Sequence, residues 1–418
     1  MGSRKDVMVQ PEFGRRLRRA RLDAQMSQLE LAGDAYTNSY VSYLESGRRA
    51  PTSDVAAYLA ARLGTTPAAL GFVNGDATDL DTRIALELLV GDKAIGRHEW
   101  VSALAAANRA LELASRSPRR DRTWEATHLK CRILIESGDF AAAAELAAQM
   151  AGDELSDLSP LLKAESLTLA ARALRGCGQL EDAAVTARAA LDVPDLDETL
   201  EVEGLLQLIA ARAELGHDPV ELTPEVARLE TVAQQLELGH TRGRVLWTIG
   251  NIAYLIGDAE RGATAHAQAA SMISATVDLA LFGRLHRVIA HYRLSNRDID
   301  GVAHELAVAR QAAELVGRPS DLVELAVEEA RLMHLQGGNA AALDEIDAAL
   351  ASTVMAIPFV GRAETLELRG DVLVALGRGS EAKAAYVQAA EDYEAMNALP
   401  RALSAWRLAA GELGPSQG

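Results

Sequence analysis

The sequence predicts an all-α protein in which a small N-terminal domain precedes a long array of helix pairs. Three observations predict this fold class. Of the 418 residues, 49% are apolar but only 4% are aromatic, so the core is built mainly from alanine and leucine. Valine, isoleucine and threonine never gather in the alternating runs that mark a strand. Finally, turns flanked by small residues recur about every 40 residues, which is typical of a repeat fold.

Length and charge divide the chain into two parts. A chain of 418 residues exceeds the roughly 100–200 residues of one compact domain. Residues 1–70 carry ten Lys and Arg against seven Asp and Glu, a net charge of +3, whereas the whole chain carries −17, which leaves −20 for the remainder. Because an acidic surface repels phosphate, any contact with nucleic acid is expected in the first part.

Several classes of protein are excluded by what the sequence lacks. Cys131 and Cys177 have no metal-ligand spacing and are expected to be buried small residues in a reducing compartment. There is no signal peptide, no apolar run long enough to span a membrane, no glycine-rich phosphate loop and no histidine–carboxylate set with metal spacing. We therefore expect a cytoplasmic protein without membrane association, metal, cofactor or enzymatic activity.

A first helix is expected near the N-terminus, after a flexible tail at residues 1–10. Phe13, Leu17 and Leu22 are expected on its apolar side, with like-signed charges on the rest: Arg15, Arg16, Arg18, Arg19 and Arg21. Ser27 and Glu30 form a capping box, which predicts a second helix from about Gln28. Its packing residues are Leu29, Leu31 and Ala32, and Gly33-Asp34 indicates its end.

A third, short helix follows, capped by Thr37 or Asn38. Val41 and Leu44 are three apart and are expected to face inward, so that polar residues face outward: Asn38, Ser39, Ser42 and Tyr43. Gly47 suits a left-handed C-terminal cap. A fourth helix over residues 54–63 closes at Gly64, and Thr66-Pro67 opens a fifth. The glycine- and aspartate-containing stretch 71–79 reads as a linker, and we place the domain at residues 11–72 and the linker at 73–80.

These five helices resemble the Cro/C1-type helix-turn-helix family. The resemblance is carried by Ser27, Gln28, Leu31, Ala32, Tyr40, Val41, Ser42, Glu45, Gly47, Arg48 and Pro51. One departure is Gly33, which stands where the family has a residue of the second helix. The resemblance implies that the third helix enters the major groove of double-stranded DNA. The residues that it implies for base edges are Asn38, Ser39 and Tyr43, with Ser42 beside them; for phosphates they are Gln28, Thr37, Arg48 and some of Arg15, Arg16 and Arg19. The alternative is a degenerate helix-turn-helix that contacts protein only.

A repeat of about 40 residues governs the rest of the chain. Turns fall near residues 257, 297, 337 and 377, after earlier ones near 96, 138, 178 and 217. Small residues stand seven before the later turns (Gly250, Ala290, Ala330, Gly370), and small or apolar ones stand five after them (Gly262, Val302, Ala342, Ala382); alanine stands twelve after. Two antiparallel helices need such residues in order to pack closely. The pattern therefore predicts eight helix pairs.

The repeats resemble the tetratricopeptide pattern, with Tyr386 at its aromatic position, although their period exceeds the usual 34 residues. Another solenoid of helix pairs is the alternative. We place the array at residues 81–412, with "LPRALSAWRLAAGEL" as its cap and a tail at 413–418. The resemblance implies that the first helix of each pair lines a concave groove. The residues that it puts there are His128, Arg132, Arg172, Arg175, Gln207, Trp247, Asn251, Tyr254, Arg287, His291, Arg331, His334, Glu367 and Asp371.

The combination of the two parts resembles the peptide-pheromone-responsive regulators of bacteria. That resemblance implies a homodimeric transcription regulator whose array binds a short peptide or a small anionic molecule, as in quorum sensing. Arginine suits bidentate recognition of carboxylate or phosphate, so we take the groove's ligand-binding set to be Arg132, Arg172, Arg175, Trp247, Asn251, Tyr254, Arg287, His291, Arg331 and His334. The alternative is a DNA-binding adaptor whose array recruits a protein partner and binds no small ligand.

Overall fold

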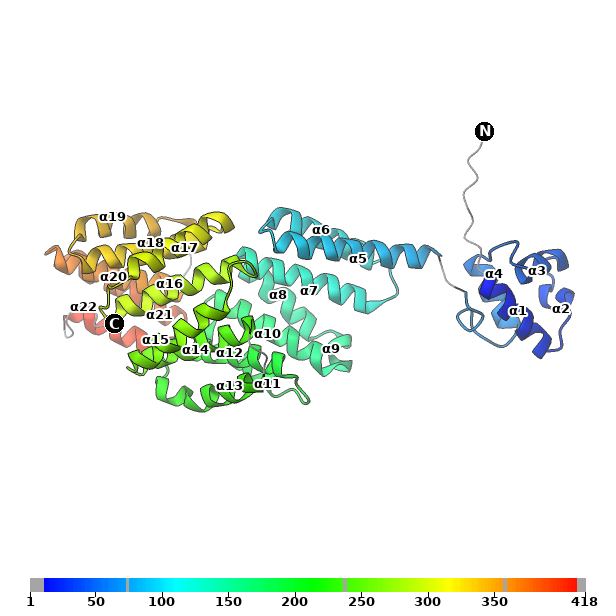
Figure 1. The fold of residues 1–418 in the computed structure, drawn as a ribbon, viewed down its shortest axis with the longest axis horizontal. Coiled ribbons are helices and arrows are strands. Elements are labelled where there is room, and N and C mark those ends of the chain that lie inside the picture. The colour runs from blue at the N-terminus through cyan, green and yellow to red at the C-terminus, as the bar shows by residue number, and fades with distance from the viewer. Residues whose placement is uncertain (1–10, 73–74, 236–238, 356–358, 412–418) are drawn as a thin grey trace, which may run out of the picture. The chain divides into compact units, whose positions relative to one another are not determined.

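The computed structural model describes residues 11–72, 75–235, 239–355 and 359–411 (Figure 1). Every regular element within these ranges is a helix, which confirms the predicted all-α class. The chain divides into two compact units, Met1–Leu86 and Glu87–Gly418. The predicted tails at 1–10 and 413–418 lie outside the described residues. No described helix is long and apolar enough to cross a membrane.

The first unit contains helices α1 (Pro11–Asp23), α2 (Gln28–Ala32), α3 (Asn38–Glu45) and α4 (Ser53–Arg62). Phe13 and Leu17 are fully buried, but Leu22 is exposed, contrary to expectation. The reason is helical geometry, because five residues at 100° each carry Leu22 well away from the face of Leu17. Arg21, four residues after Leu17, takes the buried position instead.

The α2 and α3 boundaries follow the predicted capping residues. The Ser27 hydroxyl accepts from the Glu30 N–H at 3.1 Å, and the Glu30 carboxylate accepts from the Ser27 N–H at 2.6 Å, so the predicted capping box is present. Thr37 caps α3 by accepting from the Tyr40 N–H. Leu31 and Ala32 are buried, but Leu29 is exposed because a five-residue helix has one packing face.

The predicted fifth helix at Thr66-Pro67 is a run of hydrogen-bonded turns. The Thr66 hydroxyl accepts from the Ala69 N–H at 3.2 Å, and Leu70 enters the core. A stretch this short gains too few helical bonds to offset nucleation. Likewise, α5 (Gly75–Ile95) begins inside the stretch 73–80 predicted as a linker. The apolar spacing that identifies this helix starts only at Leu80 and Ile84, so the residues before Leu80 carry no helical pattern from which the start could be predicted. Residues 73–74 lie outside the described residues.

The second unit is an array of antiparallel helix pairs, which confirms the predicted repeat fold. Eight pairs lie within the described residues: α5 with α6 (Trp100–Ala114), α7 (Arg120–Ser137) with α8 (Phe140–Ala151), α10 (Pro160–Gly176) with α11 (Leu180–Leu191), α12 (Glu198–Glu214) with α13 (Thr223–Gln235), α14 (His240–Leu255) with α15 (Ala259–Met272), α16 (Leu279–Ser295) with α17 (Val302–Val316), α18 (Pro319–Leu335) with α19 (Asn339–Leu350), and α20 (Val360–Ala375) with α21 (Gly379–Ala395). The short α9 (Glu154–Leu158) and η2 (Thr353–Met355) lie between successive pairs, whereas η1 (Pro219–Leu222) lies within a pair, between α12 and α13. Helix α22 (Leu399–Ala410) ends the described array.

The turn inside each pair contains a residue with left-handed backbone, and these residues recur at the predicted period. They are His98, Gly138, Gly178, Gly216, Gly257, Arg297, Gly337 and Gly377. In the first pair the residue is His98, two positions after the predicted Gly96. His98 and Arg297 adopt the conformation without being glycine, which is uncommon for such side chains. The period of the backbone is therefore more regular than that of the sequence.

The small residues around the turns make close contact between the paired helices possible. Ala290, Ala330, Val302, Ala342 and Ala382 are almost fully buried. A Cβ added to Gly250 would lie 2.2 Å from the His266 ring. Since α14 carries Gly250 and α15 carries His266, the glycine is what allows this ring to sit between the two helices.

Replacing Gly370 with alanine is expected to lower the free energy of unfolding by about 2 kcal/mol. The new Cβ would lie 2.3 Å from the ring of Tyr386, which is itself buried, and this clash outweighs the ~1 kcal/mol that alanine adds in a helix. Urea unfolding measures the effect. The matched control is Gly379→Ala at the start of α21, where an added Cβ meets nothing within 4 Å; it should be neutral or stabilising. Equal stability of the two variants would contradict the packing.

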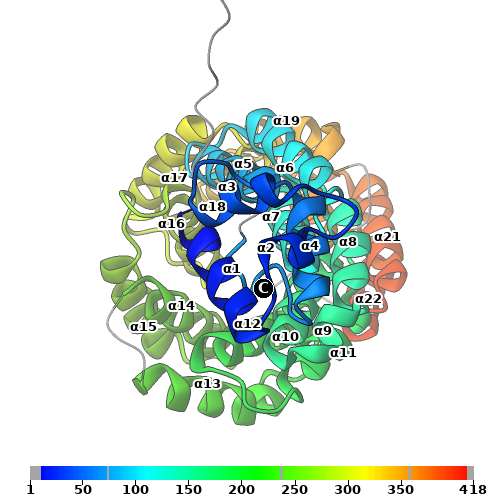
Figure 2. The same cartoon turned by 90° about the vertical axis from the view of Figure 1, so that its right-hand side faces the viewer.

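The array also contacts itself between distant pairs (Figure 2). Leu180, the first residue of α11, and Leu215, which follows α12, share a core cluster with Ala398, just before α22, and Ala402 within it. The Asn397 amide donates to Glu181 at 2.5 Å. Elsewhere, Arg318 at the start of α18 contacts Glu136 at the end of α7. In a simple solenoid each pair contacts only its neighbours, so these contacts close the superhelix on itself.

Both cysteines are free thiols. Cys131 is buried, as expected, and burial raises the pKa of its thiol to about 12. Cys177 is only half-buried, because it follows the last residue of α10 at the turn into α11.

Candidate nucleic-acid interface and sensor groove

Helix α3 presents a polar face to solvent, as the sequence predicts. Asn38, Ser39 and Tyr43 are exposed and Ser42 is half-buried, while Val41 and Leu44 are buried in the core of the first unit. Gly14 of α1 supports this arrangement, since a Cβ there would lie 2.3 Å from the Leu44 carbonyl oxygen. Helix α1 thus packs directly on the end of α3, and this contact holds the exposed face of α3 in a fixed orientation.

A buried ion pair fixes α3 to the rest of the unit. The Arg21 guanidinium donates to both Glu45 oxygens, at 2.6 and 2.9 Å, and to the Met26 carbonyl at 2.8 Å. The Gln28 amide also donates to Glu45, at 2.8 Å. Burial would raise the pKa of Glu45, but these hydrogen bonds outweigh it and hold the pKa below its usual range. Gln28, a predicted phosphate contact, therefore also has an internal partner.

The residues predicted to contact phosphates differ in whether their side chains already have a partner within the protein. Arg15 and Arg48 are exposed, and the structure gives them no ion pair with a described residue. Arg19 lies 4.0 Å from Asp23 and Arg16 lies 2.7 Å from Glu12, both at the surface. Thr37 is exposed, although its hydroxyl caps α3. Arg49, beside Arg48, lies over the Tyr40 ring at 4.9 Å.

Most of the cationic residues predicted for the groove pair with carboxylates about one repeat away; Arg331 and His334 do not. Arg172 and Arg175 of α10 pair with Glu136 and Glu214, each at 2.6 Å. Further pairs of this kind join Arg132 to Asp92, Arg287 to Glu324, His291 to Glu328 and His128 to Glu165. A ladder of ion pairs thus joins the first helices of successive pairs. The acidic half of this ladder was not predicted, although its partners stand 36–40 residues apart in the sequence, close to the length of one repeat.

Glu328 of α18 is the centre of one group of predicted residues. It is buried, and its two oxygens meet His291 Nδ1 at 2.9 Å and Arg331 Nε at 3.2 Å. Burial would raise the pKa of Glu328, but the charges of His291 and Arg331 outweigh it and bring the pKa to about 2. The structure therefore brings together His291 and Arg331, with Arg287 one turn before His291.

A second group forms around Trp247, Asn251 and Tyr254 of α14. The Tyr254 ring stacks on Tyr292 of α16 at 5.2 Å. His266 Nε2 lies 2.9 Å from Asn251 Oδ1, and burial lowers the pKa of His266 to about 4, so the ring is neutral at pH 7. Because an amide oxygen only accepts, Nε2 carries the proton. Asn251 is thereby held in one orientation.

The other predicted groove residues belong to neither group. His334 lies 2.6 Å from Asn339 of the next helix, and Gln207 is buried within α12. Asp371 accepts from the Tyr386 hydroxyl at 2.6 Å, which repeats, three pairs later, the contact between Asn251 and His266. Arg318 and Arg284, which were not among the predicted groove residues, both contact Glu136 beside Arg172.

Glu367 differs from Glu328 in the direction of its pKa shift. Burial and the neighbouring carboxylates of Glu364 and Asp371 raise the pKa of Glu367 to about 7. The unfolded carboxyl ionises near pH ~4.3. A raised pKa means that its contribution to stability is present below the unfolded pKa and is lost as the pH rises through about 7.

Glu367→Gln is therefore expected to stabilise the protein by about 1–2 kcal/mol at pH 8 and to change little below about pH 4.5. Thermal unfolding at both pH values measures this difference. Glu391→Gln on exposed surface is the matched control and should change neither value. A gain of the same size at both pH values would show that the effect is not one of ionisation.

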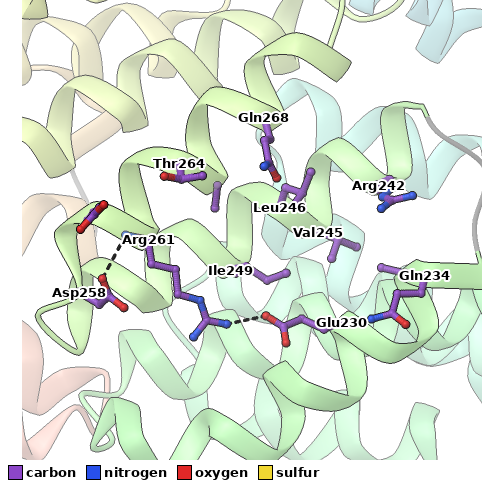
Figure 3. A pocket seen from close by; sticks show the side chains of 13 residues that line it. Glu230, Gln234, Arg242, Val245, Leu246, Ile249, Asp258, Arg261, Thr264 and Gln268 are labelled. Carbon is purple, nitrogen blue, oxygen red and sulfur yellow. Dashed lines mark hydrogen bonds and ion pairs between the residues drawn. The ribbon is translucent and has the colours of Figure 1, made fainter.

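A pocket of about 580 Å³ lies between α13, α14 and α15 (Figure 3). Its walls include Glu230, Arg242, Val245, Ile249 and Arg261. None of the ten predicted ligand-binding residues lines it. Helical spacing explains why, because Val245 and Ile249 lie on the side of α14 opposite to Trp247 and Asn251.

Comparison with known proteins agrees with this division of the chain. Residues 12–70 match the model of a helix-turn-helix domain, which confirms the predicted resemblance of the first part. No curated protein matches the chain. Among solved structures, a Rap protein complexed with competence and sporulation factor is 14% identical, with a TM-score of 0.50, over 78% of this chain and 96% of that one.

Two further structures are more distant. ComR from S. thermophilus, solved with DNA and its signalling peptide ComS, is 15% identical over 67% of this chain and 99% of that one, with a TM-score of 0.38. PlcR from Bacillus thuringiensis, solved with the peptide PapR7 and DNA, is 13% identical over 71% and 99%, with a TM-score of 0.32. At such identities the likeness concerns the fold alone. The chain thus carries a helix-turn-helix domain at residues 12–70 and shares the fold of the Rap protein over 78% of its length.

Proposed function

We propose that this chain is a sequence-specific DNA-binding transcription regulator, that it acts as a homodimer, and that its paired-helix array senses a short peptide or a small anionic molecule. The observation that carries the proposal is the exposed polar face of α3 within a helix-turn-helix unit. Asn38, Ser39 and Tyr43 are free to reach base edges, and asparagine can recognise adenine through both groups of its amide.

The surrounding residues supply the contacts that fix register without reading sequence. Arg15 and Arg48 are exposed cations without an internal partner among the described residues. Thr37 stands at the start of α3. To bind a phosphate, Arg19 would give up its weak contact with Asp23, and Gln28 would give up its hydrogen bond to Glu45. Phosphate contacts of this kind make binding depend on salt but not on sequence.

Asn38→Ala is expected to cost about 1–3 kcal/mol of binding at one base position and nothing on random DNA. Arg48→Ala is expected to weaken binding to all sequences alike and to reduce the salt slope by about 0.9. Binding titrations with DNA from upstream of the protein's own gene, repeated on a shuffled duplex over a range of salt, measure both. Equal losses for Asn38→Ala on the two duplexes would refute the assignment.

We infer that the effector site of the array lies on the side of α14 that carries Trp247, Asn251 and Tyr254. These residues would supply stacking and an amide, and the arginines would supply charge. We infer that an anionic effector there competes with the glutamates for the arginines of the ion-pair ladder. Two half-sites on DNA lie about 34 Å apart, so a change in curvature of the array alters the fit of a dimer. An effector changes DNA binding only to the extent that it binds one curvature of the array more tightly than the other.

The double substitution Arg287→Ala and Arg331→Ala is expected to abolish the response to an effector and to leave DNA binding intact. Thermal unfolding in the presence of peptide and metabolite pools measures the response, since a ligand at 100 times its Kd adds about 2.7 kcal/mol. Arg116→Ala with Arg378→Ala, two exposed arginines, is the matched control. A double variant that responds like the wild type would refute this groove. If no pool raised the unfolding temperature of the wild type, the alternative of a DNA-binding adaptor that recruits a protein partner would be favoured.

A further inference from the structure

The pocket between α13, α14 and α15 is an open groove with an apolar floor and polar walls. Val245, Ile249 and Ala265 on the floor are buried in the protein core. Gln234 of α13 stands on one wall and Gln268 of α15 on the other, both exposed. Its volume of about 580 Å³ falls within the range of ligand pockets, ~300–1,000 Å³.

The groove carries opposite charges at its two ends. Arg242 stands at one end and Asp258 at the other, with Val245 and Ile249 between them (Figure 3). Glu260 adds a second carboxylate to the lining. Arg261 does not cancel these charges, because its guanidinium is already paired with Glu230 at 2.6 Å.

The polar groups at the ends and on the walls are available to a ligand. In the described part of the chain, the side chains of Arg242, Glu260, Gln234 and Gln268 have no hydrogen bond or ion pair. Asp258 uses one carboxylate oxygen to cap α15, where it accepts from the Arg261 N–H at 3.1 Å. An arginine at one end and two carboxylates at the other complement a ligand with a carboxylate and an ammonium.

The distance between the ends indicates the size of such a ligand. Arg242 lies 13 residues before Leu255, the last residue of α14, or about 20 Å at ~1.5 Å per residue, and Asp258 stands beyond that end, in the turn to α15. An extended peptide spans ~3.3 Å per residue, so about seven residues join the two ends. Two facing glutamine amides suit the backbone of an extended chain, and the apolar floor suits its side chains.

We propose that this outer groove binds an extended peptide of about seven residues with free termini, its carboxylate at Arg242 and its ammonium at Asp258 and Glu260. The site is separate from the effector site proposed above, because it lies on the opposite side of α14 from Asn251. Its occupancy would bridge two successive helix pairs through α13 and α15.

The probe is an equimolar mixture of heptapeptides built from alanine and leucine with free termini, incubated with the full chain. Native mass spectrometry counts bound peptide. Binding to the wild type is expected, with about a tenfold loss for Arg242→Gln and for Glu260→Gln, the effect of one charge-assisted contact. The same peptides acetylated and amidated should bind at least tenfold more weakly. Arg116→Gln, at an exposed arginine outside both grooves, is the matched control and should bind like the wild type.

Each other outcome overturns the proposal in a distinct way. Loss of binding in Asn251→Ala but not in Arg242→Gln would move the peptide to the inner groove, which would favour the proposed function and refute the outer site. Equal binding of capped and free peptides would refute recognition of the termini. Absence of binding to the wild type would refute the outer site and leave the inner one to be judged by the Arg287 and Arg331 variants.

Discussion

Glu136→Ala is expected to lower the free energy of unfolding of the array by about 3–5 kcal/mol, the cost of leaving buried cations without their partner. Glu136 accepts from Arg172 at 2.6 Å and from Arg318 at 2.9 Å, and lies 3.7 Å from Arg284. Arg318 also contacts the Trp100 ring. One carboxylate on α7 thus joins three other elements of the array, namely α10, α16 and the start of α18, and its removal takes a closing contact from the superhelix.

The pH dependence of this contact has a definite sign. Burial would raise the pKa of Glu136, but the three guanidinium groups outweigh it and bring the pKa to about 2. A lowered pKa means that the stabilisation is present above the unfolded pKa, near ~4.3, and is lost as the pH falls toward about 2. Urea unfolding of the wild type and variant should therefore converge at low pH.

The control for Glu136→Ala is Glu112→Ala, which removes an exposed pair with Arg116. Such a pair contributes less than ~1 kcal/mol. If Glu136→Ala were no more destabilising than Glu112→Ala, the three arginines would not depend on Glu136, and the closure of the superhelix would have another cause.

Glu45→Ala is expected to lower the free energy of unfolding of the first unit by about 3–5 kcal/mol. The Glu45 side chain is only 4% exposed and that of Arg21 only 10%, and the substitution also removes the partner of Gln28. Since α3 would lose its attachment to α1 and α2, specific DNA binding should fall with stability. Hydrogen exchange of the α1 and α3 amides in the full chain measures the effect.

Arg19→Ala is the matched control, because Arg19 and Asp23 form an exposed pair at 4.0 Å. It should leave amide exchange in α1 and α3 unchanged within ~0.5 kcal/mol. Slow exchange retained in Glu45→Ala would contradict the role given to the ion pair.

Local rules predicted much of the fold. The capping box at Ser27, the cap at Thr37 and the inward pair Val41 and Leu44 depend on residues three or four apart, and all three are confirmed. The recurrence of the turns about every 40 residues can also be read from the sequence, and it located all eight pairs. Two of the predictions that were wrong depend on helical spacing. Leu22 was placed on the face of Leu17, although the helical period of 3.6 residues carries it away, and the start of α5 was placed too late because its apolar spacing begins only at Leu80.

The candidate groove was harder to predict, because its chemistry depends on residues far apart in sequence. Arginines were visible in the repeat, but the glutamates that pair with them come from another helix. Glu136 and Arg318 are 182 positions apart, so only the curvature of the array brings them together. The outer pocket depends on how α13 packs beside α15, which no pattern in the sequence specifies.

Selection of bound sequences from a pool of random duplexes, with the purified full chain at moderate salt, tests the central claim most directly. Enrichment of two half-sites related by two-fold symmetry, about one helical turn apart, is expected. With Asn38→Ala, one specified base position in each half-site should be lost. Recovery of unenriched sequences, with or without candidate peptides, would contradict the claim and would mean that the exposed face of α3 meets a protein.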